Sequence, residues 1–173
     1  MKTILRTAAA GLAVASLGVA SAASAATDTA DAQAEILAAL TVTVDSVNSL
    51  DVLDFGTIAE SGAGGTVTLA PGAAIPGPCG AGLVCAGPWT TPNFDVQGQP
   101  GATVNISLTN NSINLAGPGV DMPVALQLSD VSLVLDGTGA GDFDVGGTLT
   151  VGANQAVGLY TNNTDLEVNV VYN

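Results

Sequence analysis

A run of alternating apolar and polar residues over positions 30–44 constrains the fold of this chain more than any other stretch. Every even position in the run is apolar, and most odd positions are polar. A β-strand places alternate side chains on opposite faces, so the run predicts one apolar edge and one largely polar edge. Because an ordinary strand has roughly 5 to 6 residues, we place residues 40–44 inside a domain and expect residues 30–38 to project from it.

Residues 30–38, called the N-terminal run below, are a candidate donor strand that fills the sheet of another domain. The apolar side chains that would fill such a groove are Ala30, Ala32, Ala34, Ile36 and Ala38. An alanine-rich helical turn is the alternative, because Ile36, Leu37 and Leu40 also share one helical face and alanine is the best helix former.

The first 25 residues have the pattern of a secretory signal peptide. Lys2 and Arg6 precede an apolar stretch over residues 8–20, and the small-residue sequence Ala23-Ser24-Ala25 follows. The stretch is shorter than the roughly 20 residues of a membrane-spanning helix. We therefore expect cleavage after Ala25, no transmembrane segment, and export to the periplasm, the cell surface or the exterior.

Cleavage would leave a chain without any Lys, Arg or His. The full sequence has 2 basic and 15 acidic residues, and its two basic residues both lie in the predicted signal peptide. Nucleic acids draw most of their non-specific affinity from Lys and Arg, so the sequence excludes them as partners. The fold must instead depend on apolar burial and backbone hydrogen bonds.

Two cysteines, Cys79 and Cys85, lie close together in the sequence P-C-G-A-G-L-V-C-A-G-P. In an exported protein such a pair predicts a disulfide. Its loop is short, so the bond fixes a local segment and does not hold the domain together.

Short alternating segments separated by turn residues occupy the remainder of the chain. We expect an all-β fold, an immunoglobulin-like or pilin-like β-sandwich of about nine to ten short strands, over residues 40–173 after an extension at 26–39. Predicted strands include residues 50–58, 66–70 with Val67 and Leu69 inward, 93–97, 103–109 with Val104 and Ile106 inward, 157–160, and a C-terminal strand with Leu166, Val168, Val170 and Tyr172 facing one side. In residues 124–135 the apolar parity changes between Leu128 and Val131, which predicts a turn or bulge there. Residues 71–92, which are rich in proline and glycine, are predicted to be a loop.

Several of these segments resemble a known family. The motifs are L-D-F-G-T-I at residues 53–58, G-G-T-V-T-L at 64–69, F-D-V-Q-G-Q-P-G-A at 94–102, G-G-T-L-T-V-G-A-N-Q at 146–155 and V-N-V-V-Y-N at 168–173. Together they look like the bacterial secreted domain family of unknown function 4402, over nearly the whole mature chain. The ending is also similar to that of chaperone-usher pilins, with a penultimate Tyr172 and a preceding Gly158. This likeness implies self-association or a periplasmic assembly chaperone as partner.

The sequence is poorly provided for catalysis, and we expect no enzyme activity. Without His or Lys there is no ordinary base for a nucleophile and no cation for an oxyanion. A calcium site is conceivable in the segment D-G-T-G-A-G-D-F-D, with Asp136, Asp142 and Asp144 as ligands, because calcium takes carboxylate and carbonyl oxygens. A plain hairpin loop is the simpler interpretation, and we expect no other cofactor.

Two classes of function follow from these patterns. The first is a secreted structural or surface subunit, pilus-like, that lends its N-terminal run to a neighbour's open sheet edge. The second is a self-contained secreted binding domain, with or without calcium, in which the run folds back onto its own sheet.

Overall fold

The fold consists of β-strands. The computed structural model describes residues 27–48, 50–60, 62–73, 79–80 and 82–173. Within these residues there is no helix, and the all-β prediction is confirmed. The strands, which number eleven in this part of the chain, are β1 Thr41–Val44, β2 Thr57–Glu60, β3 Gly65–Leu69, β4 Leu83–Ala86, β5 Asn93–Gln97, β6 Thr103–Leu108, β7 Ser112–Leu115, β8 Met122–Leu128, β9 Ser132–Val134, β10 Ala140–Val151 and β11 Val168–Tyr172.

The chain divides into two units, residues 1–35 and 36–173. In the first unit, residues 27–35 have no regular secondary structure and their side chains are exposed. All of the strands in the described residues belong to the second unit, which also includes residues 36–40.

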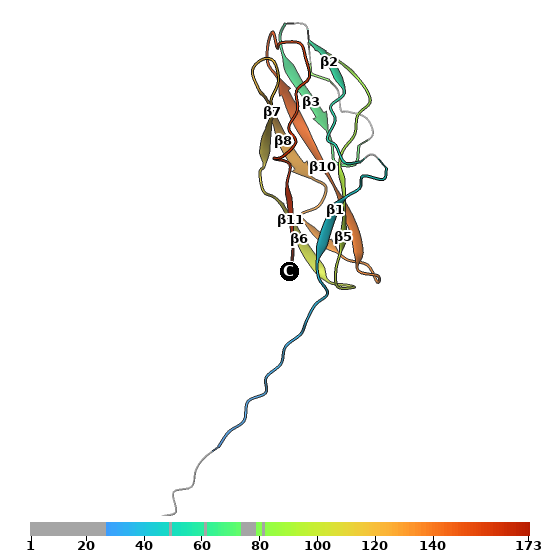
Figure 1. Ribbon diagram of the computed structural model, residues 1–173, viewed down its shortest axis with the longest axis vertical. Coiled ribbons are helices and arrows are strands. Elements are labelled where there is room, and N and C mark those ends of the chain that lie inside the picture. The colour runs from blue at the N-terminus through green and yellow to red at the C-terminus, as the bar shows by residue number, and fades with distance from the viewer. Residues whose placement is uncertain (1–26, 49, 61, 74–78, 81) are drawn as a thin grey trace, which may run out of the picture. The chain divides into compact units, whose positions relative to one another are not determined.

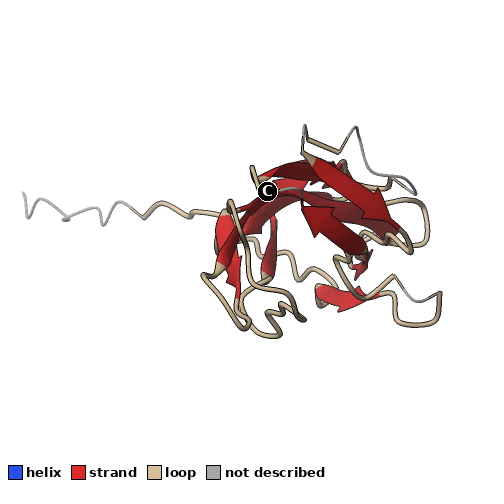
Figure 2. Ribbon diagram, turned by 90° about the horizontal axis from the view of Figure 1, so that it is seen from above, coloured by secondary structure: helices blue, strands red, loops and turns tan. Residues whose placement is uncertain are grey.

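The strands of the second unit form three antiparallel sheets. The largest has the order β1-β5-β10-β8-β7, with β3 also paired to β10. The others are β11-β6-β9 and the two-stranded pair β2-β4. Seen from above, the sheets are curled (Figure 2). Figure 1 shows β5 beside the first part of β10 and β3 beside its last part, in agreement with the pairing.

Two hydrophobic cores lie one after the other along β10. Phe143 and Val145 belong to a cluster shared with β5 and β6, whereas Leu149 and Val151 belong to a cluster shared with β3, β4, β7 and β8. These four residues all occupy odd positions, so one face of a single long strand supplies both cores. The largest sheet therefore packs against the β11-β6-β9 sheet at one core and against the β2-β4 pair at the other. The finer immunoglobulin-like or pilin-like assignment stays a prediction.

For several strands the sequence correctly predicted which alternate residues are buried. Val67 and Leu69 of β3 and Val104 and Ile106 of β6 are buried, as their alternation indicated. β1 begins one residue after the predicted Leu40, and Leu40 itself packs against the core cluster around Phe143.

Other local predictions were wrong. Residues 157–160 form no strand, and Val157 and Leu159 are almost fully exposed. Of the predicted strand at residues 50–58, only Thr57 and Ile58 are in a strand, although Leu50 and Asp54 make isolated bridges. Residues 71–92, which were predicted to be a loop, contain β4. This segment forms a strand because β2 supplies backbone hydrogen-bond partners for it, which its proline- and glycine-rich composition did not indicate.

Candidate functional site

The C-terminal strand β11 has one open edge. It pairs with β6, and the amides of Thr109 and Asn173 donate to the carbonyls of Glu167 and Thr103 at the two ends of this ladder. In an antiparallel pair such bonds alternate, so the odd-numbered residues of β11 bond to β6. The backbone amide and carbonyl groups of Val168, Val170 and Tyr172 therefore point away from β6. In the described part of the chain no strand pairs with that edge.

The first strand, β1, has an open edge of the same kind. The amide of Asp45 donates to the carbonyl of Asn93 at 2.9 Å, which places the odd residues of β1 in bonded pairs with β5. The amides of Val42 and Val44 therefore point away from β5. β1 is the last strand on this side of its sheet among the residues described.

These two edges flank the same core and run antiparallel to each other. Leu40 and Val42 on one side and Val168, Val170 and Tyr172 on the other pack against the cluster around Phe143. The Tyr172 hydroxyl donates to the Ala38 carbonyl at 2.8 Å, so the end of β11 lies at the beginning of β1. Figure 1 shows the C-terminus near the start of β1, in agreement with this bond. We call the space between the two open edges the seam.

The end of the seam where β1 begins is closed by Tyr172. Besides its bond to Ala38, the phenol oxygen accepts a hydrogen bond from the amide of Gln99 at 2.7 Å. The side-chain oxygen of Gln99 in turn accepts from the amide of Ala38 at 3.3 Å. A Cβ on Gly98 would come within 2.6 Å of the Tyr172 oxygen and 2.9 Å of Leu40. Only glycine therefore fits at position 98 without displacing this closure.

The opposite end of the seam opens into a cavity of about 320 Å³, called the seam cavity. Val44, from the end of β1, and Leu166, just before β11, both line it. Apolar side chains from distant segments complete the wall, chiefly Leu53, Phe94, Ile113 and Val124. Sequence reasoning missed this cavity, because its wall is assembled from segments that are more than 100 residues apart.

A hydrogen-bonded turn at residues 162–165 forms the polar rim of the seam cavity. The Asn162 side chain donates to the Asp165 carboxylate at 2.7 Å and to the Asn114 carbonyl at 2.9 Å, which ties the turn to β7. The bond from Asn162, followed by that from the Thr164 hydroxyl, lowers the pKa of Asp165. Asn162 and Asn163 line the cavity. The rim of the cavity is therefore joined to β7 by the Asn162 side chain.

The N-terminal run forms neither a strand nor a helix, and all of its side chains are exposed. The helical alternative is thus not found in these residues. Ile36, the only large side chain on the predicted apolar edge, is 94% exposed. Ala38 is held by Tyr172 and Gln99. The donor-strand assignment of Ala30, Ala32, Ala34, Ile36 and Ala38 stays a prediction.

The three candidate calcium ligands come from two elements, a turn and the strand β10 that follows it. Asp142 and Asp144 lie in β10, not in a loop, and both accept from the Asn93 side chain, at 3.3 and 3.1 Å. Asp136 caps the preceding turn, accepting from the amides of Thr138 and Ala140. The Ala140 amide, followed by the Thr138 hydroxyl, lowers its pKa.

Asp136 and Asp142 line one surface hollow together with Asp95, which the sequence did not single out. Asp95 is directly opposite Asp142 in the β5–β10 ladder. Among the described residues, no three acidic or metal-binding side chains gather closely enough to hold a metal ion. Calcium binding stays a prediction.

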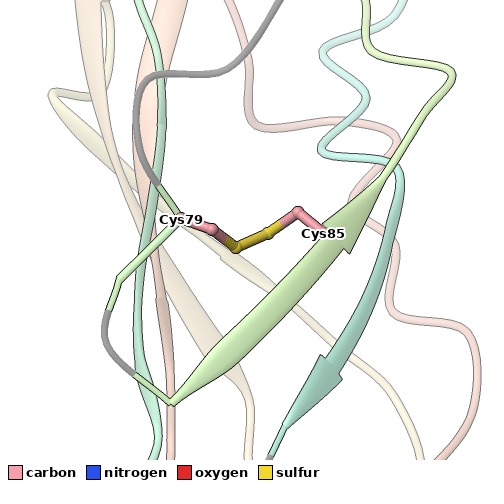
Figure 3. Close-up of a disulfide and its surroundings, with 2 residues drawn as sticks. All are labelled: Cys79 and Cys85. Atoms are coloured by element: carbon pink, nitrogen blue, oxygen red, sulfur yellow. A yellow bond between two sulfur atoms is a disulfide. The ribbon is translucent and has the colours of Figure 1, made fainter.

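Cys79 and Cys85 are joined by a disulfide (Figure 3). Cys85 lies in β4, and both cysteines pack against the core cluster around Leu149. Disulfides persist in oxidising compartments, so the bond agrees with the oxidising environment that the sequence predicts. Neither cysteine lines the seam cavity, although Ile113 and Val124 of the cavity wall belong to the same core as the disulfide.

No helix among the described residues is long and apolar enough to cross a membrane. The predicted signal peptide, residues 1–25, lies outside the described residues.

Comparison with known proteins gives one match. Residues 42–172 match the family described as Domain of unknown function (DUF4402). Neither the curated proteins nor the solved structures contain a match.

Proposed function

Since the chain belongs to the family described as Domain of unknown function (DUF4402), whose description assigns no activity, we propose a function from its geometry. The protein is an exported structural subunit that assembles by strand addition. The N-terminal run of one copy enters the seam of another and supplies the strand that both open edges lack.

One observation carries this proposal: the facing open edges of β1 and β11 beside a shared apolar core. An unpaired edge is a template for another strand, and proteins ordinarily cover or charge such edges. The even residues on both sides of the seam are apolar and uncharged. Leu40, Val42, Val168 and Val170 are only partly buried, so a further strand would complete their burial.

The N-terminal run has the chemistry that the seam requires. Its even positions are apolar and would face the core. Of its four odd positions, which would face solvent, Asp31, Gln33 and Glu35 are polar and Leu37 is apolar. A strand rises about 3.3 Å per residue, so the five residues of β11 span roughly 17 Å and the seven residues 30–36 roughly 23 Å. The run is therefore long enough to cover the seam.

Open edges are a liability before assembly. We therefore propose an assembly chaperone in the periplasm as a second partner, which would cover the seam until another copy replaces it. The predicted signal peptide and the disulfide support export to such a compartment.

The test compares the mature chain, residues 26–173, with a truncated chain that begins at Ala38 and so keeps the Tyr172 bond. The mature chain should give a ladder of oligomers on an unboiled gel, and the truncated chain should remain a monomer with an unchanged Tm. If instead the mature chain is monomeric and truncation lowers its Tm, the run closes its own sheet. The protein would then be the self-contained binding domain.

A further inference from the structure

The two ends of the seam differ, and this difference fixes which part of the N-terminal run reaches which part of a neighbour. At one end Tyr172 and Gln99 already hold Ala38 of the same chain. At the other end lies the seam cavity, where the described residues leave space next to Val44 and Leu166. A strand from another copy therefore has only the cavity end through which to enter.

Ile36 is the side chain that must occupy the entrance. Ala38 is fixed to its own domain, and Ile36 precedes it by only two residues. It is the first side chain of the predicted apolar edge that can leave the domain. Because Ile36 cannot extend far from Ala38, it can reach only the near end of a neighbour's seam, whereas Ala34, Ala32 and Ala30 continue along it.

We infer that the seam cavity is the receptor pocket for Ile36 of a second copy, and that the inserted run lies antiparallel to β11 and parallel to β1. This inference rests on the proposed function. The pocket wall is chemically suited to an isoleucine, since Leu53, Phe94, Val124 and Leu166 are apolar. Ala34, Ala32 and Ala30 would then lie along the seam, where the two strands share the core around Phe143.

This polarity has a consequence for the assembly. The run leaves a domain at the Tyr172 end and enters its neighbour at the cavity end, so the two contacting surfaces are different. A heterologous contact of this kind does not close on itself unless the rotation happens to form a ring, and it produces filaments.

The same geometry distinguishes assembly between copies from insertion of the run into its own seam. A run that turned back into its own seam would keep Ile36 near Tyr172 and bring Ala32 towards the cavity.

Paired cysteines distinguish these arrangements. One variant carries Ile36→Cys with Val52→Cys, because Val52 lines the cavity and is 54% exposed. The matched control carries Ala32→Cys with Val52→Cys, in which the first cysteine lies on the same face at the far end of the run. Both mature proteins are treated with a short bismaleimide, and the products are separated on a boiled, reducing gel.

We expect the variant with Ile36→Cys and Val52→Cys to give a ladder of covalently linked oligomers. The variant with Ala32→Cys and Val52→Cys should give no such ladder. An intermolecular ladder from the Ala32 pair alone would overturn the polarity and leave strand addition standing. The Ala32 pair could instead give an intramolecular link, seen as a monomer band whose mapped peptide joins positions 32 and 52. This result would overturn both the proposed polarity and strand addition. If the uncrosslinked ladder forms but neither pair links, the pocket assignment fails and the proposed function survives.

Discussion

The hydroxyl of Tyr172 donates a hydrogen bond to the backbone carbonyl of Ala38 and so joins residues 134 positions apart in the sequence. The same oxygen accepts from the amide of Gln99. This single side chain thereby connects the last strand, the start of the first strand and the turn after β5. The sequence indicated that Tyr172 lies on one face of a C-terminal strand, and the structure shows that it closes one end of the seam.

We predict that Tyr172→Phe destabilises the domain. It removes both hydrogen bonds and leaves the Ala38 carbonyl and the Gln99 amide without this partner, at a cost of about 1–3 kcal/mol. Chemical denaturation gives the free energy of unfolding, and hydrogen exchange at the Gln99 amide should become faster. Tyr160→Phe is the matched control, since that hydroxyl also bonds two backbone groups, of Gly119 and Ala156, but within exposed loops. An equal decrease in the free energy of unfolding in the two variants would contradict the role given to Tyr172.

Ile36→Asp should abolish oligomers without destabilising the monomer. The side chain is exposed in the free chain, so its replacement costs the fold little. In an assembled seam, the variant would lose burial worth roughly 1.5–3 kcal/mol and would place an unpaired carboxylate among apolar groups. An unboiled gel and electron microscopy report assembly, and Tm reports the fold. Glu35→Gln is the control and should assemble like the parent, because position 35 faces solvent. Filaments that survive Ile36→Asp would exclude strand addition through this residue.

Stability should fall in acid partly through Asp136. Its carboxylate accepts two amide bonds and one hydroxyl bond, and its folded pKa lies below the ordinary value of 3.8. A lowered folded pKa contributes stability that is present above the unfolded pKa and is lost as the pH falls through the folded value. We therefore expect Tm to drop as the pH is lowered below about 3.8, and we expect Asp136→Asn to show a shallower drop. Parallel Tm curves for the two proteins in that range would contradict this assignment.

Removal of the disulfide should weaken the domain without preventing folding. For a loop closed by residues six apart in sequence, chain entropy accounts for about 2 kcal/mol. The variant Cys79→Ser with Cys85→Ser should unfold at correspondingly lower denaturant, and reduction of the parent should have the same effect. Because neither cysteine lines the seam cavity, assembly through the seam should persist in the folded variant. Loss of the oligomer ladder in a folded variant would show that the two regions are coupled.

Relief of a like-charge pair should stabilise the sheet. Asp95 and Asp142 are directly opposite in neighbouring strands, and the chain after the predicted cleavage site has no Lys, Arg or His side chain to offset them. Asp95→Asn should raise Tm slightly, by roughly a few tenths of a kcal/mol in stability, and added sodium chloride should raise Tm less in the variant than in the parent. Asp130→Asn, outside the strands, is the control. An unchanged salt response would indicate that the pair is already satisfied.

Much of the fold was predictable because alternation is a local property. The parity of Val67 with Leu69 and of Val104 with Ile106 is visible in consecutive residues and correctly indicated their buried faces. The change of parity between Leu128 and Val131 likewise marked the break between β8 and β9. The two cysteines were close enough in sequence for their pairing to be inferred directly.

By contrast, only the tertiary structure decided which strands are neighbours and which edges stay open. β10 includes Asp142 because β5 pairs with it, and β4 forms within a proline-rich segment because β2 pairs with it. Residues 157–160 also alternate, but in the described part of the chain no strand pairs with them, and Val157 and Leu159 are exposed. The seam cavity joins Val44, Phe94 and Leu166, whose proximity no local pattern encodes. Periodicity shows which face of a strand is apolar, but the pairing of strands depends on contacts between segments far apart in the chain.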